Sequence, residues 1–114
     1  MSNAVLHEIT QGFDLDLLIE SSAKRPVIIF KHSNSCGTSL HQFEQISNLS
    51  AEVHIVVVQN ARQESNRIAE ITGVRHHSPQ VIVLSEGKVI YHGSHYSIDF
   101  DKIEKIIQGQ SGAA

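Results

Sequence analysis

The sequence predicts one α/β domain in which helices cover both faces of a mixed β-sheet. Apolar, strand-like runs alternate with helical patterns along the chain, and a turn signal joins the last two of these runs. A chain of 114 residues also has the length of a single compact domain. The expected order is β-α-β-α-β-α-β-β-α, with parallel pairing through the helices and one antiparallel hairpin.

The first three elements are expected within residues 5–31. Residues 5–9, "VLHEI", predict a short strand. Asp14 is a typical N-cap residue, and the apolar residues that follow it at helical spacing predict a helix through residue 23. Residues 27–31, "VIIFK", are apolar and rich in β-branched side chains, which indicates a central strand buried on both faces.

The middle of the chain is expected to hold two helices around a second buried strand. Residues 53–58, "VHIVVV", predict that strand. The helix after it spans residues 62–73 and ends at Gly73, a natural C-cap. The helix before it is expected over residues 36–50, because apolar residues recur there at intervals of three. Its expected apolar stripe consists of Leu40, Phe43, Ile46 and Leu49.

The C-terminal part of the chain predicts a β-hairpin and a last helix. Pro79 precedes "QVIVLSEGKVIYHG", in which two strand-like runs flank the turn signal "SEGK". An amphipathic helix follows and is expected to end at Gly109. The single domain then spans residues 1–114, with 109–114 expected as a frayed tail and 1–4 as a remnant of an expression tag.

Composition and charge argue against several classes of protein. The net charge is −3, and no basic stripe is present, so nucleic acid is not expected as a partner. No apolar run approaches the roughly 20 residues of a membrane span, and no signal peptide is visible at the N-terminus. A single cysteine argues against a disulfide-stapled secreted domain. We therefore expect a cytoplasmic protein without a membrane partner, and nothing in the sequence indicates its oligomeric state.

The only cysteine, Cys36, lies in "SNSCGTSL", between a buried strand and the start of a helix. Unpaired N–H groups and the helix dipole stabilise an anion at such a position, so the pKa of the thiol should fall. Lys31 and His32 lie just upstream and add positive potential. Gly37 offers little steric cover to the sulfur. This pattern predicts a nucleophilic cysteine.

Ser39 follows Cys36 by three residues, which places both side chains on one face of a helix. In a dithiol oxidoreductase, a second cysteine at this position resolves the mixed disulfide. Serine cannot do so, although its hydroxyl can donate a hydrogen bond to the thiolate. The spacing therefore predicts a one-cysteine mechanism, in which Cys36 attacks a disulfide sulfur and an external thiol resolves the intermediate.

A structural role for Cys36 is the main alternative. A lone cysteine is often a small buried core residue. Cys36 lies off the apolar stripe of its helix and between serine and glycine, which favours the reactive interpretation.

Pro79 precedes a strand that we expect beside residues 27–31. A cis peptide bond at this proline would turn a backbone edge toward Cys36, whereas a trans bond is commoner at a strand start. The sequence leaves both isomers open.

The eight histidines raise the question of a metal site. His76 and His77 are adjacent, and His92 and His95 are three residues apart. Adjacent side chains on an extended segment point apart, and one thiol with scattered imidazoles lacks a compact ligand spacing. No metal site is therefore predicted, and some of these histidines are expected to line a groove near Cys36.

Three stretches of the chain together resemble the monothiol bacilliredoxins, a thioredoxin-like family of the bacillithiol redox system. They are "IIFKHSNSCGTS", "GVRHHSPQ" and "GKVIYHGSHYSID", and the likeness covers roughly residues 5–108. The resemblance implies a thioredoxin fold, a cytoplasmic location and removal of bacillithiol from mixed disulfides on proteins, with no bound cofactor. By position it implies Cys36 as the nucleophile and Ser39 in place of the resolving cysteine. It also implies that Ser78 and Pro79 form the cis-proline loop that faces the sulfur.

One departure from the family pattern concerns the identity of the small thiol. The family usually has proline directly after the cysteine, where this sequence has Gly37 and then Thr38. The "CGTS" loop is therefore also similar to the "CGFS" loop of monothiol glutaredoxins, which hold glutathione. Some of those proteins share an iron–sulfur cluster between two subunits. Lys31, "SPQV" and Gly93-Ser94 stand where glutaredoxins have a lysine, a threonine-valine-proline loop and a glycine pair.

These observations lead to one main hypothesis and two alternatives. The main hypothesis is a thiol–disulfide oxidoreductase that acts on thiolated proteins, with a small acidic thiol such as bacillithiol as co-substrate. The alternatives are an iron–sulfur cluster or metal carrier with Cys36 as a ligand, and a non-catalytic thioredoxin-fold module that docks extended segments. Cationic groups are expected to hold the acidic thiol, because carboxylates pair with cations. The expected substrate-binding residues are Lys31, Gly37, Thr38, Arg75, Ser78, Pro79 and His95.

Overall fold

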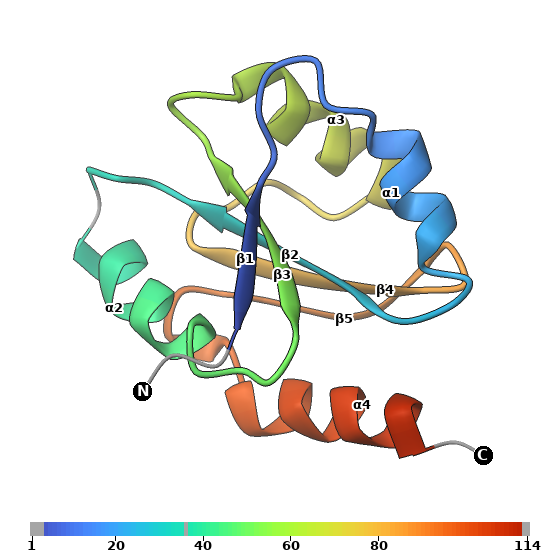
Figure 1. Ribbon diagram of the computed structural model, residues 1–114. Helices are drawn as coiled ribbons and strands as arrows, with labels where there is room; N and C mark the ends of the chain where they lie inside the picture. Colours follow the sequence, from blue (N-terminus) through green and yellow to red (C-terminus); the bar gives the residue numbers. More distant parts are fainter. Residues whose placement is uncertain (1–3, 36, 113–114) are drawn as a thin grey trace.

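The computed structural model describes residues 4–35 and 37–112, so Cys36 itself lies outside the described residues. A mixed five-stranded sheet in the order β1-β3-β2-β4-β5 forms the centre of the fold (Figure 1). β1 and β2 both pair in parallel with β3, whereas β4 runs antiparallel to β2 and to β5. The strands are β1 (Val5–Glu8), β2 (Val27–His32), β3 (Glu52–Val57), β4 (Gln80–Ser85) and β5 (Lys88–Ser94).

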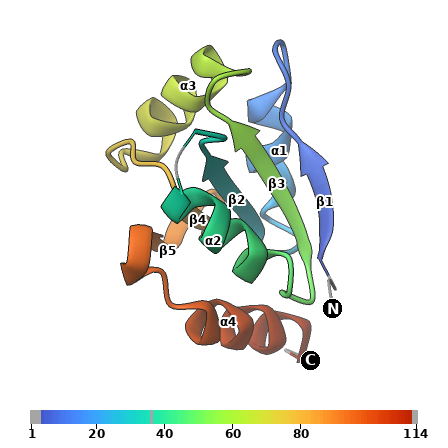
Figure 2. The ribbon, with the colours of Figure 1, turned by 90° about the vertical axis from the view of Figure 1, so that its left-hand side faces the viewer.

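Four α-helices cover the two faces of this sheet, so the expected element order and mixed α/β architecture are confirmed (Figure 2). α1 (Leu15–Ser21) and α3 (Arg62–Thr72) pack against one face, and α2 (Gly37–Ile46) and α4 (Phe100–Gly112) against the other. Within the described residues, no helix combines the length and the apolar character needed to cross a membrane.

β2 is apolar at successive positions because it contributes to two cores. Val27 and Ile29 pack in the core beneath α1 and α3, and Ile28 and Phe30 pack in the core beneath α2 and α4. Side chains alternate between the faces of a strand, so a strand that is covered on both sides is apolar on both. The expectation of a doubly buried central strand is therefore confirmed.

Local signals at turns and helix ends are also confirmed. The Asp14 side chain caps α1 by accepting a hydrogen bond from the Leu17 backbone N–H at 3.1 Å. Gly73 ends α3 in the left-handed region, with φ of 72°. Glu86 and Gly87 both have positive φ, at 53° and 74°, in the tight turn between β4 and β5.

The expected helix after Cys36 is wrong in its end and in the first member of its apolar stripe. α2 ends at Ile46 rather than at residue 50, and Leu40 is 58% exposed. The predicted stripe members Phe43, Ile46 and Leu49 do pack in the core beneath α2. The buried residues of α2 are Ser39, Gln42 and Ile46, so Ser39 and Gln42 are buried in addition to the predicted positions. Apolar periodicity missed Ser39 and Gln42 because both are polar residues that make hydrogen bonds within the fold.

The C-terminal boundary also differs from the prediction. α4 continues to Gly112, so Gly109 does not end it and the expected tail over residues 109–114 is wrong for its first four residues. A single glycine within a helix costs only about 1 kcal/mol relative to alanine, which a helix that packs on a core can tolerate. A short 3-10 helix, η1 (His95–Ser97), follows β5 and was not predicted.

Gly93 leaves space beside β5 that the Tyr91 side chain uses. A Cβ atom at Gly93 would lie 2.8 Å from the Tyr91 hydroxyl. That hydroxyl accepts a hydrogen bond of 2.8 Å from the backbone N–H of Asp99. Asp99 in turn accepts a hydrogen bond from the N–H of Lys102 in the first turn of α4. The glycine therefore permits a side-chain link between β5 and the start of α4.

Replacing Gly93 with alanine is expected to lower the free energy of unfolding by about 1–2 kcal/mol, because the added methyl group displaces the Tyr91 hydroxyl from Asp99. Urea unfolding of the wild type and the variant measures this difference. The Tyr91→Phe background is the control, since it lacks the hydroxyl that the methyl group meets. If Gly93→Ala lowers the free energy of unfolding by the same amount in the Tyr91→Phe background, the steric explanation is wrong.

Candidate active site

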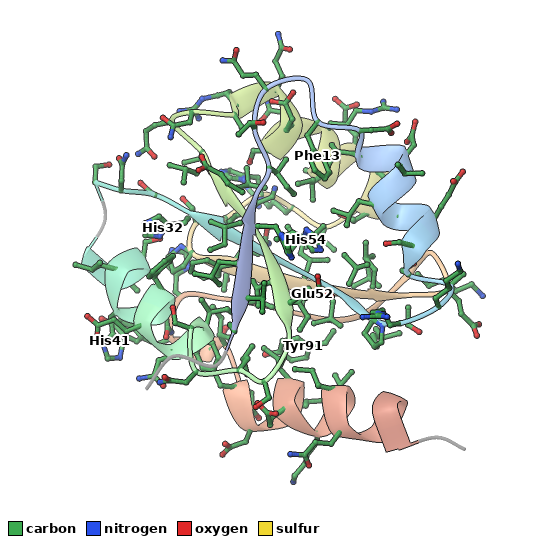
Figure 3. The ribbon with its side chains drawn as sticks, in the orientation of Figure 1. Phe13, His32, His41, Glu52, His54 and Tyr91 are labelled. Atoms are coloured by element: carbon green, nitrogen blue, oxygen red, sulfur yellow. The ribbon has the colours of Figure 1, made fainter. Side chains whose placement is uncertain are left out.

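The candidate site lies where β2 and β3 end. These two strands are parallel, so the segments that leave them meet at one edge of the sheet. Residues 33–35 leave β2 and lead to Cys36, and Gln59 follows β3. Figure 3 shows His32 at this end of β2, beside the start of α2, whereas His54 lies farther along the sheet.

Gln59 holds the segment that leads to Cys36. Its Oε1 accepts a hydrogen bond from the N–H of Asn34 at 3.3 Å. Its Nε2 donates to the hydroxyls of Ser33 at 2.8 Å and Ser35 at 3.1 Å. One amide therefore fixes three consecutive residues on the N-terminal side of Cys36. Sequence reasoning missed Gln59, although its place directly after a strand parallel to β2 was a usable signal.

Replacing Gln59 with methionine is expected to slow alkylation of Cys36 or shift its pH dependence, with a rate change of about fivefold, because the loop loses its hydrogen bonds. The measurement is the rate of reaction with iodoacetamide between pH 5 and 9, beside a thermal unfolding curve. Gln63→Met is the matched control, since Gln63 is exposed on α3. Equal rates and equal pH profiles for all three proteins would show that Gln59 does not position the thiol.

Ser39 is completely buried and joins the start of α2 to the end of β2. Its hydroxyl accepts a hydrogen bond of 2.9 Å from the N–H of Ser33 and lies 3.0 Å from Nδ1 of His32. A hydroxyl has one proton to donate. When Nδ1 of His32 carries no proton, the Ser39 hydroxyl donates its proton to Nδ1. The Ser39 proton is available to a different acceptor only when Nδ1 is itself protonated. The structure therefore supports a positioning role for Ser39, which holds the start of α2 against the end of β2.

His32 is the partner that decides how this serine hydrogen bonds. Burial is the main cause that lowers the pKa of His32, against a smaller opposing effect of a hydrogen bond to the Ser39 backbone. The ring is therefore neutral near pH 7. The aromatic rings of Phe30 and Phe43 flank it, with centroids at 5.9 and 5.1 Å.

Lys31 does not reach the surface. Its side chain is fully buried, and its ammonium donates hydrogen bonds to the Ser65 carbonyl at 2.9 Å and to Nδ1 of His76 at 3.1 Å. Burial lowers the pKa of Lys31 from 10.5 to about 8. The expectation that Lys31 contacts the small thiol directly is not supported by this placement. Its positive charge instead lies behind His76.

His76 presents a neutral ring between Lys31 and the surface. Burial, followed by the positive charges of Lys31, His77 and Arg62, lowers the pKa of His76. Since Nδ1 of His76 accepts from the Lys31 ammonium, its remaining ring proton is on Nε2.

The loop before β4 packs against η1 and α2. The Ser78–Pro79 peptide bond is cis, and the Pro79 carbonyl accepts a hydrogen bond of 3.0 Å from the N–H of His95. The carbonyl of His95 accepts from the Gln42 side chain on α2. The rings of His77 and His95 lie edge to face at 5.8 Å. Two segments that are far apart in the sequence thus lie together beside α2.

The other predicted site residues lie on β2, on α2 and in the loop before β4. β2 and β4 pair directly, so Lys31 lies opposite the residue that follows Pro79. Gly37 is exposed as the first residue of α2, and Thr38 is partly buried beside it. Arg75 is exposed, and its carbonyl accepts a hydrogen bond from the Gln80 side chain.

The cations of this region have no acidic partner within the described residues. The ion pairs found in residues 4–35 and 37–112 join His7 and Arg25 to Glu52, and Arg67 to Asp16. None of them involves Lys31, Arg62 or Arg75. The same part of the chain contains no cluster of three His, Cys, Asp or Glu side chains suited to a metal ion.

Comparison with known proteins identifies the family. Residues 7–103 match the family described as monothiol bacilliredoxin BrxC. The chain belongs to the monothiol bacilliredoxin family. The matched range includes Cys36 and every other predicted site residue. As a bacilliredoxin family member, it is a thiol redox protein, and the resemblance seen in its sequence is confirmed.

Solved structures show that this bacilliredoxin family member has the thioredoxin fold. A putative oxidoreductase with a thioredoxin fold matches with a TM-score of 0.79 and 24% identity, over 90% of this chain and 93% of the other. A mutant thioredoxin from Halobacterium salinarum matches with a TM-score of 0.66 and 17% identity, over 100% and 97% of the two chains. Schistosoma mansoni thioredoxin matches with a TM-score of 0.66 and 20% identity, over 95% and 97%.

Proposed function

We propose that this protein removes a low-molecular-weight thiol, bacillithiol or a close chemical relative, from mixed disulfides on cytoplasmic proteins, with Cys36 as the only nucleophile. The observation that carries this proposal is the monothiol bacilliredoxin match over residues 7–103, which includes the single cysteine of the chain. A protein with one cysteine cannot form an internal disulfide. An external thiol must therefore complete each cycle.

The reaction consists of two thiol–disulfide exchanges. In the first, the Cys36 thiolate attacks the sulfur of the small thiol in the mixed disulfide, and the target cysteine leaves as a thiolate that takes up a proton. Cys36 then carries the small thiol as a mixed disulfide. In the second, the thiolate of another small-thiol molecule attacks that adduct. This step releases the symmetrical small-thiol disulfide and restores the Cys36 thiolate.

The described residues around Cys36 support this chemistry by holding the nucleophile's loop. Gly37 begins α2, whose free N–H groups favour a thiolate at the preceding residue. Gln59 fixes the segment before Cys36, and Ser39 fixes the first turn after it. A loop held from both sides keeps the sulfur in one geometry, which lowers the entropic part of the barrier.

Positive charge near His76 supports an acidic small thiol as co-substrate. Arg62 and Arg75 are exposed and have no ion pair in the described part of the chain. Guanidinium groups bind carboxylates through paired hydrogen bonds. The buried Lys31 adds positive charge behind His76, without a direct contact to the small thiol.

A de-thiolation assay tests the proposal. One target protein is loaded through its cysteine with either bacillithiol or glutathione, and release of the small thiol is followed in the presence of the reduced free thiol. We expect catalysed release, and faster release of bacillithiol than of glutathione. Catalysis of glutathione release alone would overturn the assignment of the thiol, and no catalysis with either substrate would overturn the function.

A further inference from the structure

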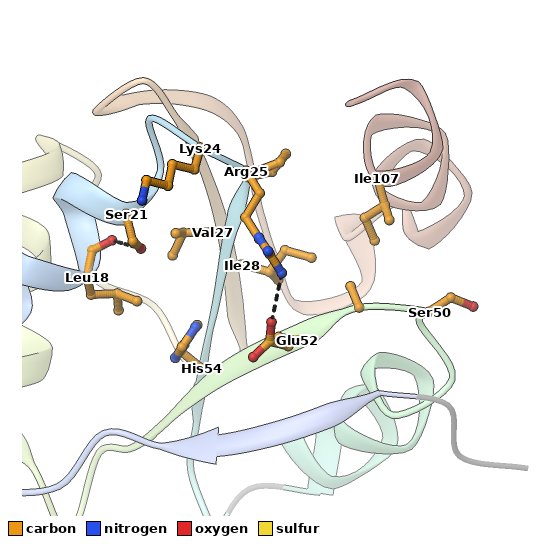
Figure 4. Close-up of a pocket in the computed structure, with 12 residues that line it drawn as sticks. Leu18, Ser21, Lys24, Arg25, Val27, Ile28, Ser50, Glu52, His54 and Ile107 are labelled. Atoms are coloured by element: carbon orange, nitrogen blue, oxygen red, sulfur yellow. Dashed lines mark hydrogen bonds and ion pairs between the residues drawn. The ribbon is translucent and has the colours of Figure 1, made fainter. Parts of the chain in front are cut away.

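A cavity of about 610 Å³ lies at the end of the sheet opposite the candidate active site. It surrounds the beginning of β2 and is bounded by α1, the start of β3 and α4 (Figure 4). The candidate active site lies instead where β2 and β3 end. Cavities of roughly 300–1,000 Å³ are typical of small-molecule sites. The position and size of this cavity mark it as a second site.

The inner wall of the cavity is mainly apolar and comes from both layers of helices. Leu18 contributes from α1, Val27 and Ile28 from the start of β2, and Ile107 from α4. Val27 and Ile28 point to opposite faces of the sheet, so the cavity extends around the end of the strand. Such a wall fits a hydrocarbon chain or ring.

Two cations lie at the mouth of the cavity on the connection between α1 and β2. Lys24 extends toward Ser21, and Arg25 extends toward Glu52 (Figure 4). Nη1 of Arg25 lies 3.3 Å from one Glu52 oxygen, and the other Glu52 oxygen lies 2.9 Å from the His7 ring. Lys24 has no ion pair among the described residues. The mouth therefore carries two cations and one carboxylate.

His54 lines the wall of the cavity and adds no charge to Lys24, Arg25 and Glu52 at its mouth. Burial is the main cause that lowers the pKa of His54, so its ring is neutral at pH 7. The hydrogen bond from His7 is the main cause that lowers the pKa of Glu52, which keeps that carboxylate ionised. One positive charge at the mouth thus remains without a counter-charge.

We propose that this cavity binds a small amphipathic monocarboxylic acid. Its apolar body contacts Leu18, Val27 and Ile107, and its carboxylate lies between Lys24 and Arg25. A neutral apolar molecule would leave Lys24 without a partner, and a ligand with several negative charges would be repelled by Glu52. Arg25 uses one of its five N–H donors on Glu52 and has others for the ligand. The site takes no part in thiol exchange, so it is independent of the proposed function.

Octanoate and 1-octanol distinguish the two parts of this proposal, because they share an alkyl chain and differ in charge. The full-length protein labelled with ¹⁵N is titrated with each compound and followed by two-dimensional amide spectra. We expect saturable shifts around Val27, Ile28 and His54 with octanoate, and binding about tenfold weaker with octanol. Lys24→Gln combined with Arg25→Gln is expected to weaken octanoate binding about tenfold and to leave octanol binding unchanged.

Arg67→Gln is the control for the loss of a surface charge elsewhere, because Arg67 is exposed on α3 and lies outside the cavity. This variant should bind octanoate as the wild type does. Equal affinity for octanoate and octanol, equal weakening by Arg67→Gln, or shifts that do not saturate would each overturn the proposal. Lys24 and Arg25 are both exposed, so their replacement should leave the fold intact, and the unbound spectra verify this.

Discussion

Replacing Cys36 with serine is expected to reduce de-thiolation by a factor on the order of 1,000 or more. A serine hydroxyl is not ionised near neutral pH and cannot form the mixed disulfide through which the small thiol is transferred. The chain has no second cysteine that could take over. The measurement is the initial rate of bacillithiol release from the loaded target protein, at equal concentrations of the two proteins.

A second readout separates the loss of chemistry from the loss of binding or folding. The wild type, stopped early and alkylated, should show a mass increase of one small-thiol molecule on Cys36, and the serine variant should show none. Both proteins should unfold at similar temperatures. Release that continues at the wild-type rate in the serine variant would refute the mechanism. A wild type that is inactive and binds iron after anaerobic purification would instead favour the cluster-carrier alternative.

Replacing Lys31 with methionine is expected to raise the free energy of unfolding at pH 7 by about 1–3 kcal/mol. The folded state lowers the pKa of Lys31 from 10.5 to about 8 because it buries the ammonium. The protonated form is therefore disfavoured by folding. Below pH 8 both states are protonated and the full penalty, at most about 3 kcal/mol, is present. Methionine fills a similar volume without this penalty.

The pH dependence of this difference identifies its cause. Between pH 8 and 10.5 the unfolded state binds the proton that the folded state has lost, so the stability of the wild type rises with pH. The advantage of the methionine variant should shrink over this interval and disappear above it. Urea unfolding at several pH values measures it, with Lys105→Met on the exposed side of α4 as the control. A difference that is the same at every pH, or a less stable variant at pH 7, would contradict the burial explanation.

Much of the fold could be predicted from local patterns. The alternation of strand-like and helical periods correctly gave the order of the elements, because each period depends only on neighbouring residues. Asp14 and Gly73 marked helix ends through capping rules that are equally local. The pairing of β2 with β4 was also expected, which placed Pro79 near Lys31.

The candidate site was predicted only in part. The Pro79 carbonyl and the His95 N–H are joined by a hydrogen bond, whereas the Lys31 ammonium contacts Ser65 of α3 and His76. The prediction treated Lys31 as a surface contact, because the depth of a side chain depends on what covers it. Gln59 was missed, because its partners are about 25 residues earlier in the chain and are reached only when two parallel strands end side by side.

The sequence by itself determined the family, the single cysteine and the order of secondary structure, since these depend on residue identity and on short-range spacing. The tertiary structure decided the burial of Lys31 and Ser39, the exposure of Leu40 and the cavity around the start of β2. These features arise where α1, α2, α3 and α4 pack against the sheet. Packing joins residues that are distant in the chain, and no local periodicity contains that information.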